Sequence, residues 1–251
     1  MDMSALPKAA QLVSLGECAP RWRPGLARMG HRALHSEIFA SGDEAGGVAC
    51  ALALALDDMR ACASPALEEK PVLWVQDEAS RKRSGYPYRP GLPAQLRHRV
   101  IHVAARGAQD TLFALEEGMR CRDLAFVIGE IAGNPRALGL TASRRLSLAA
   151  EKHGVPLFLI RHDAARDLSS ARMRWQVRSA ASAPPRWNGD APGVPSWHAQ
   201  LFRARAHPPS QWILRDDGTS LAAEHPDPGQ TRSPDHGDLA GAAGAGSLAA
   251  L

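Results

Sequence analysis

The stretch ALHSEIFASGDEAGGVACALALALDDMRAC, residues 33–62, decides the fold class of this chain. Its alternating apolar residues from Ala33 to Phe39 predict a β-strand. The turn-rich segment 41–47 (SGDEAGG) then leads into an apolar run, residues 48–62, that predicts a buried helix. A strand, a glycine-rich loop and a helix in this order are typical of α/β proteins that hold phosphate at the helix N-terminus.

Strand and helix continue to alternate as far as residue 161. This order implies right-handed crossovers and therefore a mostly parallel, doubly wound α/β sheet. After residue 170 the helical pattern stops and short strands follow, and the final pair is a predicted antiparallel hairpin across 207–210. The predicted strands after the first one are residues 71–75, 100–104, 124–128, 155–160, 173–178, 196–204 and 211–215.

Two of the predicted helices have recognisable ends. Asp110 is expected to cap one of them, and Thr141 is expected to cap the other, residues 142–153, which Gly154 would end. A basic and aromatic segment at 81–90 is expected to be a loop. The residues predicted to share the buried face of the helix capped by Asp110 are Leu112, Leu115 and Met119.

The composition fits a cytoplasmic protein with a packed core. Apolar residues make up 45% of the 251 residues, and no apolar run is long enough to cross a membrane. The N-terminus lacks the pattern of a secretory signal. The net charge of +4 is unevenly placed, since residues 161–215 carry nine basic and three acidic side chains. Such a basic segment suits an acidic partner, either a nucleic acid or a protein surface.

These patterns divide the chain into four parts. Residues 1–30 are predicted to be an arm with little structure of its own, and an α/β core is predicted over 31–165. A β-rich, basic extension is predicted over 166–216. Residues 217–251, which are acidic and rich in Gly, Ala and Pro, are expected to be disordered.

The loop at 41–47 has the spacing of a phosphate loop but not its chemistry. A working loop reads G-x-x-x-x-G-K-[ST], in which the lysine reaches the phosphates and the hydroxyl holds Mg²⁺. Gly42 and Gly47 have that spacing, but Val48 and Ala49 stand where the lysine and the hydroxyl would be. Two carboxylates in the loop would also repel a polyphosphate. The degenerate phosphate loop comprises Gly42, Asp43, Glu44, Gly46, Gly47, Val48 and Ala49.

The strand-end acid that would hold Mg²⁺ in a nucleotide site is displaced as well. The predicted strand 124–128 is followed by Gly129, and the first acid, Glu130, comes one residue later. We therefore expect no ATP hydrolysis, no cofactor and no enzymatic activity. Residual nucleotide binding at the loop, with Glu130 serving after a shift, stays open as the alternative to a plain β–α turn.

The sequence predicts no metal site. His98 and His102 are four residues apart, as are His31 and His35, but both pairs run into predicted strands, where this spacing separates the side chains. The four cysteines form no C-x-x-C pair and are expected to be reduced thiols.

Two groups of arginines are candidate contacts for a partner or for DNA. Arg144 and Arg145 are expected in the first turn of a helix, where they oppose the helix dipole, so an outside contact competes with a solvated or internally paired role. On the strand 173–178, alternation places Trp175 on the buried face. The opposite face carries the second group of arginines, which are Arg172, Arg174 and Arg178. Arginines interleaved with aromatic residues are typical of proteins that bind single-stranded nucleic acid.

Several stretches of the sequence carry a resemblance to a known family. The most specific is LTASRRLSLAAEKHGVPLFLIR at 140–161. The others are PVLWV at 71–75 with YRPGL at 88–92, ALEEGMRC at 114–121, RWQV at 174–177 and PPRW at 184–187. Over residues 33–215 the chain resembles the ImuA family, from which it departs at Asp43 and Glu44 of the loop.

The resemblance implies a diverged RecA-like core without a strict ATP site. It also implies a role beside ImuB, a catalytically defective relative of Y-family polymerases, and an error-prone DNA polymerase III α-type subunit, in copying DNA past lesions during the SOS response. The favoured hypothesis is a non-catalytic adaptor that supports assembly of these partners, with DNA as a further candidate contact. Two alternatives are a weak DNA-stimulated ATPase and an inhibitor of cell division in the damage response.

Overall fold

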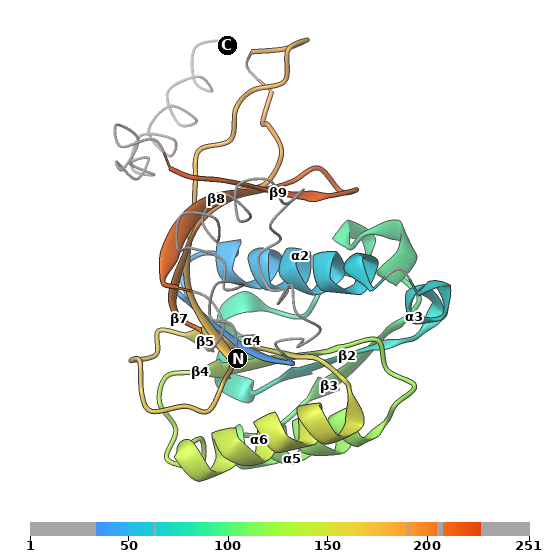
Figure 1. Cartoon of the computed structure of the whole chain (residues 1–251), viewed down its shortest axis with the longest axis vertical. Coiled ribbons are helices and arrows are strands. Elements are labelled where there is room, and N and C mark those ends of the chain that lie inside the picture. The colour runs from blue at the N-terminus through green and yellow to red at the C-terminus, as the bar shows by residue number, and fades with distance from the viewer. Residues whose placement is uncertain (1–33, 63, 190, 205–207, 227–251) are drawn as a thin grey trace, which may run out of the picture.

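The computed structural model describes residues 34–62, 64–189, 191–204 and 208–226. These residues form one nine-stranded sheet with helices on both faces, in the strand order β3-β2-β4-β5-β1-β6-β7-β8-β9 (Figure 1). The predicted α/β class, a mostly parallel sheet with antiparallel strands at its C-terminal side, is confirmed. The predicted arm, residues 1–30, lies outside the described residues.

The sheet and its helices are built from short elements. The six parallel strands are β1 (His35–Ala40), β2 (Val72–Gln76), β3 (Val100–Ala104), β4 (Val127–Ala132), β5 (Leu157–His162) and β6 (Met173–Ser179). The strands that continue antiparallel to β6 are β7 (Ser196–Ala204), β8 (Ser210–Asp216) and β9 (Leu221–Glu224). The α-helices are α2 (Gly46–Ala61), α3 (Pro65–Glu69), α4 (Glu78–Ser84), α5 (Ala108–Arg120) and α6 (Leu140–His153).

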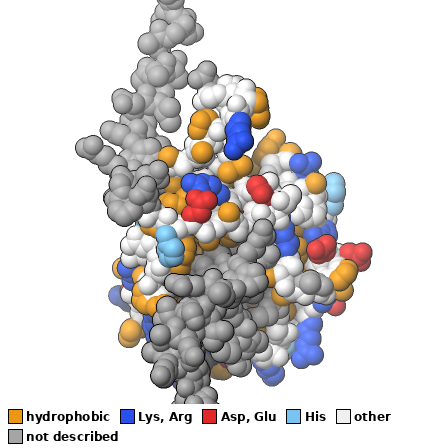
Figure 2. All heavy atoms as spheres, turned by 45° about the horizontal axis from the view of Figure 1, so that its top comes forward, with side chains coloured by type: hydrophobic (Ala, Val, Ile, Leu, Met, Phe, Trp, Pro, Cys, Tyr) orange, Lys and Arg blue, Asp and Glu red, His pale blue; other side chains and the backbone are white. Residues whose placement is uncertain are grey.

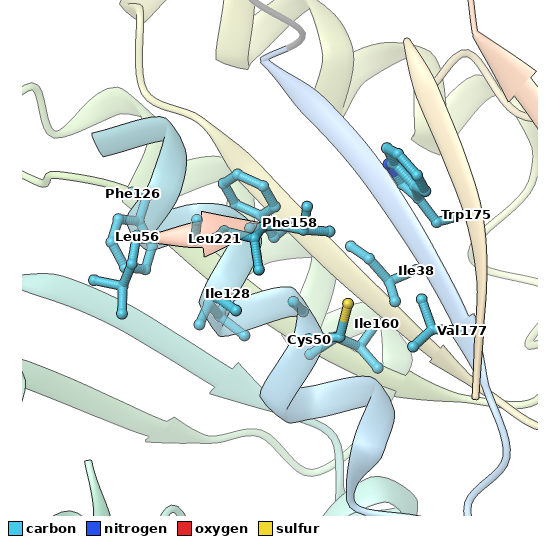
Figure 3. Packing of buried hydrophobic residues seen from close by; sticks show 14 of the residues in the cluster. Ile38, Cys50, Leu56, Phe126, Ile128, Phe158, Ile160, Trp175, Val177 and Leu221 are labelled. Carbon is cyan, nitrogen blue, oxygen red and sulfur yellow. The ribbon is translucent and has the colours of Figure 1, made fainter. Parts of the chain in front are cut away.

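Helix α2 is buried along most of its length because the sheet coils around it (Figure 1). It shares one core with Ile38 and Phe158 of the central strands (Figure 3). The last strands cover its other side, since Leu221 of β9 belongs to the same core and Arg60 donates a 2.8 Å hydrogen bond to the carbonyl oxygen of Gly218. A helix that is apolar on all sides is stable only under such cover. The buried helix predicted from the sequence is therefore confirmed.

Helices α5 and α6 cover the opposite face of the sheet (Figure 1). The two predicted N-caps are wrong, because α5 begins after Gly107 and α6 begins after Gly139, which places Asp110 and Thr141 inside the first turns. The predicted end of α6 is correct, since Gly154 adopts the left-handed conformation with a φ of +73°. The predicted buried residues of α5 are also confirmed, and these are Leu112, Leu115 and Met119.

The C-terminal strands extend the core sheet and do not form a separate layer. Strand β6 pairs in parallel with β1, and the predicted hairpin is the antiparallel pair β7–β8. The prediction of disorder from residue 217 onward is wrong for the first residues, because β9 pairs with β8. Asp217 stabilises the intervening turn by accepting 2.7 Å hydrogen bonds from the hydroxyl and N–H of Thr219 and from the N–H of Ser220, which lower the pKa of Asp217. Residues 227–251 lie outside the described residues.

Two segments near the degenerate loop differ from the predicted pattern. Strand β4 begins at Val127, three residues later than predicted. The apolar residues 124–126 are buried but precede the strand. Glu130 therefore lies inside the strand and does not follow it. The predicted loop at 81–90 is wrong in its first part, which belongs to α4. The carboxylate of Asp77 accepts the N–H of Ser80 at 2.7 Å and so caps this helix.

Gly47 allows α2 to approach β1 closely. A Cβ atom at this position would overlap the Cβ of Ala40, the last residue of β1. We predict that Gly47→Ala lowers the free energy of unfolding by about 1–3 kcal/mol, because the helix has to move away from the sheet. Urea unfolding measures this change. Gly189→Ala is the matched control, since a Cβ at Gly189 meets nothing within 4 Å; equal losses in both variants would contradict the packing explanation.

His35 begins β1 in a buried position and makes the stability of the chain depend on pH. Its Nδ1 lies 2.8 Å from the Oγ of Ser147, and burial lowers the pKa of His35 to about 4. The unfolded chain, with a histidine pKa of about 6.5, therefore takes up the proton first. The stabilisation is complete above about pH 6.5 and is lost as the pH falls toward 4, by about 3 kcal/mol in all.

Urea unfolding between pH 7 and pH 4 tests this prediction. His35→Gln should remove that part of the pH dependence, whereas His98→Gln, at an exposed histidine, should keep the wild-type slope. If the free energy of unfolding fell equally with pH in the wild type and in His35→Gln, burial of His35 would not be the cause of the pH dependence.

Candidate functional site

A pocket of about 570 Å³ lies beside the degenerate loop, toward the carboxyl ends of β1, β2 and β4. One wall is the loop with the first turns of α2, and the other is the segment 84–92, which contributes Tyr86 and Tyr88. Trp74 and Glu130 belong to the strands beneath it. Open α/β sheets bind ligands at this edge. The loop singled out in the sequence therefore borders a pocket, and the walls of that pocket are largely apolar and aromatic.

A carboxylate from the end of β5 engages the backbone of the loop. The N–H of Gly42 donates a 2.8 Å hydrogen bond to Oδ1 of Asp163, which directly follows β5 and forms an ion pair with Arg83 of α4. Asp163 itself adopts a left-handed conformation with a φ of 48°. A Cβ atom on Gly42 would lie 2.6 Å from Oδ2 of Asp163, so the glycine permits this close approach. Gly42 thus has a carboxylate of the same chain as its partner, in the place where a phosphate loop binds phosphate.

The other residues of the loop connect it to the sheet. Oε2 of Glu44 accepts the N–H of Ser179 at 2.9 Å, which joins the loop to the end of β6. Gly46 packs against the same residue, since a Cβ atom there would lie 2.6 Å from Oγ of Ser179. Neither an ammonium group nor a hydroxyl group comes from the loop residues that line the pocket, which are Gly42, Asp43, Glu44, Ala45, Val48 and Ala49.

Glu130 is fully engaged by neighbouring side chains at the floor of the pocket. Its Oε1 accepts hydrogen bonds from Nε1 of Trp74 at 2.7 Å and Nε2 of Gln76 at 3.0 Å. Its Oε2 lies 3.2 Å from Oγ of Ser84 and 3.0 Å from Nε2 of His162. A carboxylate has about four acceptor positions, and four side-chain atoms lie within hydrogen-bond distance of its two oxygens, with the single proton of Ser84 shared with the carbonyl oxygen of Ser80. The geometry favours a structural role for Glu130 over the metal-binding role left open by the sequence.

The structure buries Arg174, which the sequence placed among the candidate contacts. Nε of Arg174 lies 2.7 Å from Oε2 of Glu37 in β1, and Arg161 lies 3.9 Å from the other oxygen of this carboxylate. Ser169 donates a further hydrogen bond to Glu37 at 2.8 Å. The guanidinium of Arg174 also stacks over the ring of Phe39. The prediction of an accessible contact is therefore wrong for Arg174, because its charge is paired inside the protein.

The other candidate arginines lie at or near the surface. Arg144 and Arg178 are exposed. Since α6 begins at Leu140, Arg144 and Arg145 lie in its second turn, where the helix dipole has little effect. Two of the candidates form ion pairs with acidic residues of this chain. Arg145 pairs with Glu116, and Arg172 pairs with Glu151. Arg144, Arg145 and Arg178 are the exposed candidates, and of these Arg145 is already paired with Glu116.

The described residues contain no group of histidine, cysteine and carboxylate side chains that could hold a metal ion. Nε2 of His102 lies 2.8 Å from Oε1 of Gln76, and His31 lies outside the described residues. Cys50 is a free, buried thiol, and burial raises its pKa. None of the helices in the described part of the chain is long and apolar enough to cross a membrane.

Sequence reasoning missed the residues that complete the site. Asp163 is 121 positions from its partner Gly42, and no local pattern connects them. Tyr86 and Tyr88 were expected only in an aromatic loop, without a pocket beside them. A usable signal did exist for Glu37, because a charged residue in an apolar central strand needs a buried partner.

Two comparisons bear on the relationship of this chain to known proteins. No model of a protein family matches the chain. Protein ImuA from two strains of Caulobacter vibrioides is 32% identical to it over 154 residues, which are 57% of this chain and 59% of that protein. The chain therefore spans less than two thirds of the length of these curated relatives. Over the matched stretch, the comparison confirms the resemblance to the ImuA family that the sequence predicted.

Proposed function

We propose that this chain is a non-catalytic accessory protein of error-prone translesion DNA synthesis in the SOS response. In this role it supports the assembly of ImuB with an error-prone DNA polymerase III α-type subunit, and it acts in the cytoplasm without a nucleotide cofactor. The similarity to Protein ImuA supports the general setting, a mutagenesis system of the ImuA and ImuB type.

The observation that carries the non-catalytic part of the proposal is the hydrogen bond between Gly42 and Asp163. A triphosphate would have to displace an ion-paired carboxylate from the loop and then lie beside Asp43 and Glu44. Each charge-assisted hydrogen bond to a phosphate contributes about 1.5–3 kcal/mol. The lysine and hydroxyl that would supply such bonds in a phosphate loop are replaced by Val48 and Ala49, and the guanidinium of Arg83 beside the pocket is already paired with Asp163.

Titration calorimetry with Mg-ATP tests this part. We expect no heat of binding at ATP concentrations up to about 1 mM, and no release of phosphate with or without single-stranded DNA. The variant Val48→Lys/Ala49→Thr restores the motif residues but keeps Asp163, so it should also fail to bind. Adding Asp163→Ser to this variant then tests whether the carboxylate of Asp163 prevents ATP from binding. Micromolar binding by the wild type would contradict the proposal and favour a weak ATPase.

The adaptor part of the proposal is tested with purified partners. The full-length chain and ImuB from the same genome should co-elute from a gel-filtration column at micromolar concentrations. Adding the polymerase subunit should give a larger complex that forms only when both other proteins are present. Separate elution of the chain and ImuB would contradict the adaptor role.

A further inference from the structure

The segment 180–195 joins β6 to β7, and its described residues, 180–189 and 191–195, project away from the sheet at the top of the view in Figure 1. Its base is closed by a 3.0 Å hydrogen bond from the N–H of Ala180 to the carbonyl oxygen of Ser196. Its two arms touch further out, where a Cβ atom on Gly193 would overlap the carbonyl oxygen of Ala183. The projecting loop, residues 180–195, therefore has a defined base from which its outer part extends.

Trp187 lies in this projecting loop and is 81% exposed. Of the tryptophans in the described part of the chain, the others are at most 6% exposed, and they are Trp74, Trp175, Trp197 and Trp212. Transfer of an exposed indole from water into an apolar environment is strongly favourable. Exposed tryptophans that become buried on association are among the residues that contribute most to protein interfaces.

The sequence beside Trp187 reduces the cost of ordering it in a complex. Pro184 and Pro185 restrict the backbone immediately before Arg186 and Trp187. The N–H of Asn188 also donates a 3.1 Å hydrogen bond to the carbonyl oxygen of Pro185, which forms a turn around the tryptophan. Preorganisation of this kind increases affinity because less conformational entropy is lost on binding.

The charge of the projecting loop separates two classes of partner. It contains one basic residue, Arg186, and one acidic residue, Asp190, so it carries no net charge. Figure 2 shows basic, acidic and apolar side chains interspersed on the described part of the face in view, without a surface of one sign. Binding to nucleic acid depends on several basic groups that neutralise phosphates. A neutral loop with one exposed tryptophan fits a protein partner better.

We propose that the projecting loop is a docking element and that Trp187 is its anchor. The partner is a protein surface with an apolar pocket that accepts an indole, and with a carboxylate at the rim for Arg186. The identity of the partner rests on the proposed function, which makes ImuB the protein that presents this surface.

The test compares the affinity of ImuB for the full-length chain and for Trp187→Ala. We expect Trp187→Ala to bind ImuB about 30-fold more weakly, which is the effect of a strong interface residue. Trp187→Phe should recover part of the affinity. Phe113→Ala is the matched control, since Phe113 is an aromatic residue of α5 that is 67% exposed, and it should bind like the wild type. All variants should melt within about 2 °C of the wild type, because these side chains are exposed.

Each outcome decides between named possibilities. Equal affinity of Trp187→Ala and the wild type for ImuB would overturn the docking role but leave the adaptor function standing. Absence of binding by the wild type would overturn both. A loss of affinity for oligo(dT) in Trp187→Ala, with binding to ImuB unchanged, would assign the loop to single-stranded nucleic acid and would also overturn the inference.

Discussion

Replacing Glu37 with alanine is expected to lower the free energy of unfolding by about 3–5 kcal/mol. Glu37 is fully buried and pairs with Arg174, which is itself 3% exposed, while Arg161 lies close to the same carboxylate. Removal of the carboxylate leaves Arg174 in the interior without its ion-pair partner, and it takes from Arg161 the nearer of two negative charges, the other being Asp167. A domain of this size has a total stability of about 5–15 kcal/mol, so the variant should unfold at a much lower urea concentration than the wild type.

Two further variants separate the buried charge from other effects of the substitution. Glu117→Ala removes a carboxylate from an exposed ion pair with Arg120 and should change the stability by less than about 1 kcal/mol. The double variant Glu37→Leu/Arg174→Met replaces the pair with apolar groups of similar size, and it should regain much of the stability lost in Glu37→Ala. A loss of less than about 1 kcal/mol in Glu37→Ala would contradict the inferred pairing.

The parts of the fold that could be predicted from the sequence are those in which a short pattern determines the structure. Apolar alternation identified β1, and the continuous apolar run identified α2 as a helix covered on all sides. The alternation of Trp175 with arginines correctly placed this tryptophan in the core. In each case the apolar side chains of a short window are the ones that the element buries, so a window of about ten residues contains the necessary information.

The parts that could not be predicted depend on residues far apart in the chain. The same alternation that placed Trp175 also placed Arg174 on the opposite face, but the sequence did not show that Glu37, 137 positions away, lies beside it. The hydrogen bond between Gly42 and Asp163 has the same character. The predicted caps failed because each helix begins earlier than its pattern indicates, after Gly107 in the case of Asp110 and after Gly139 in the case of Thr141.

Replacement of Glu130 is expected to have an effect of similar size, and it distinguishes a structural acid from a metal ligand. Glu130→Ala would leave Nε1 of Trp74 and Nε2 of Gln76 without their buried acceptor, and would also remove the partner of His162. Each unsatisfied buried donor costs about 1–3 kcal/mol, so a total loss of about 3–5 kcal/mol is expected. Urea unfolding measures this loss.

The stability of the wild type and of Glu130→Ala, each measured with and without Mg-ATP, distinguishes the two roles of Glu130. An acid that holds Mg²⁺ must keep acceptor positions directed at the metal, so its removal would weaken nucleotide binding more than it weakens the fold. In this chain neighbouring side chains lie within hydrogen-bond distance of both carboxylate oxygens. The loss of stability should therefore be the same with and without Mg-ATP. If Mg-ATP stabilised the wild type but not Glu130→Ala, the carboxylate would belong to a working nucleotide site, and the pocket would bind the ligand that its loop is expected to exclude.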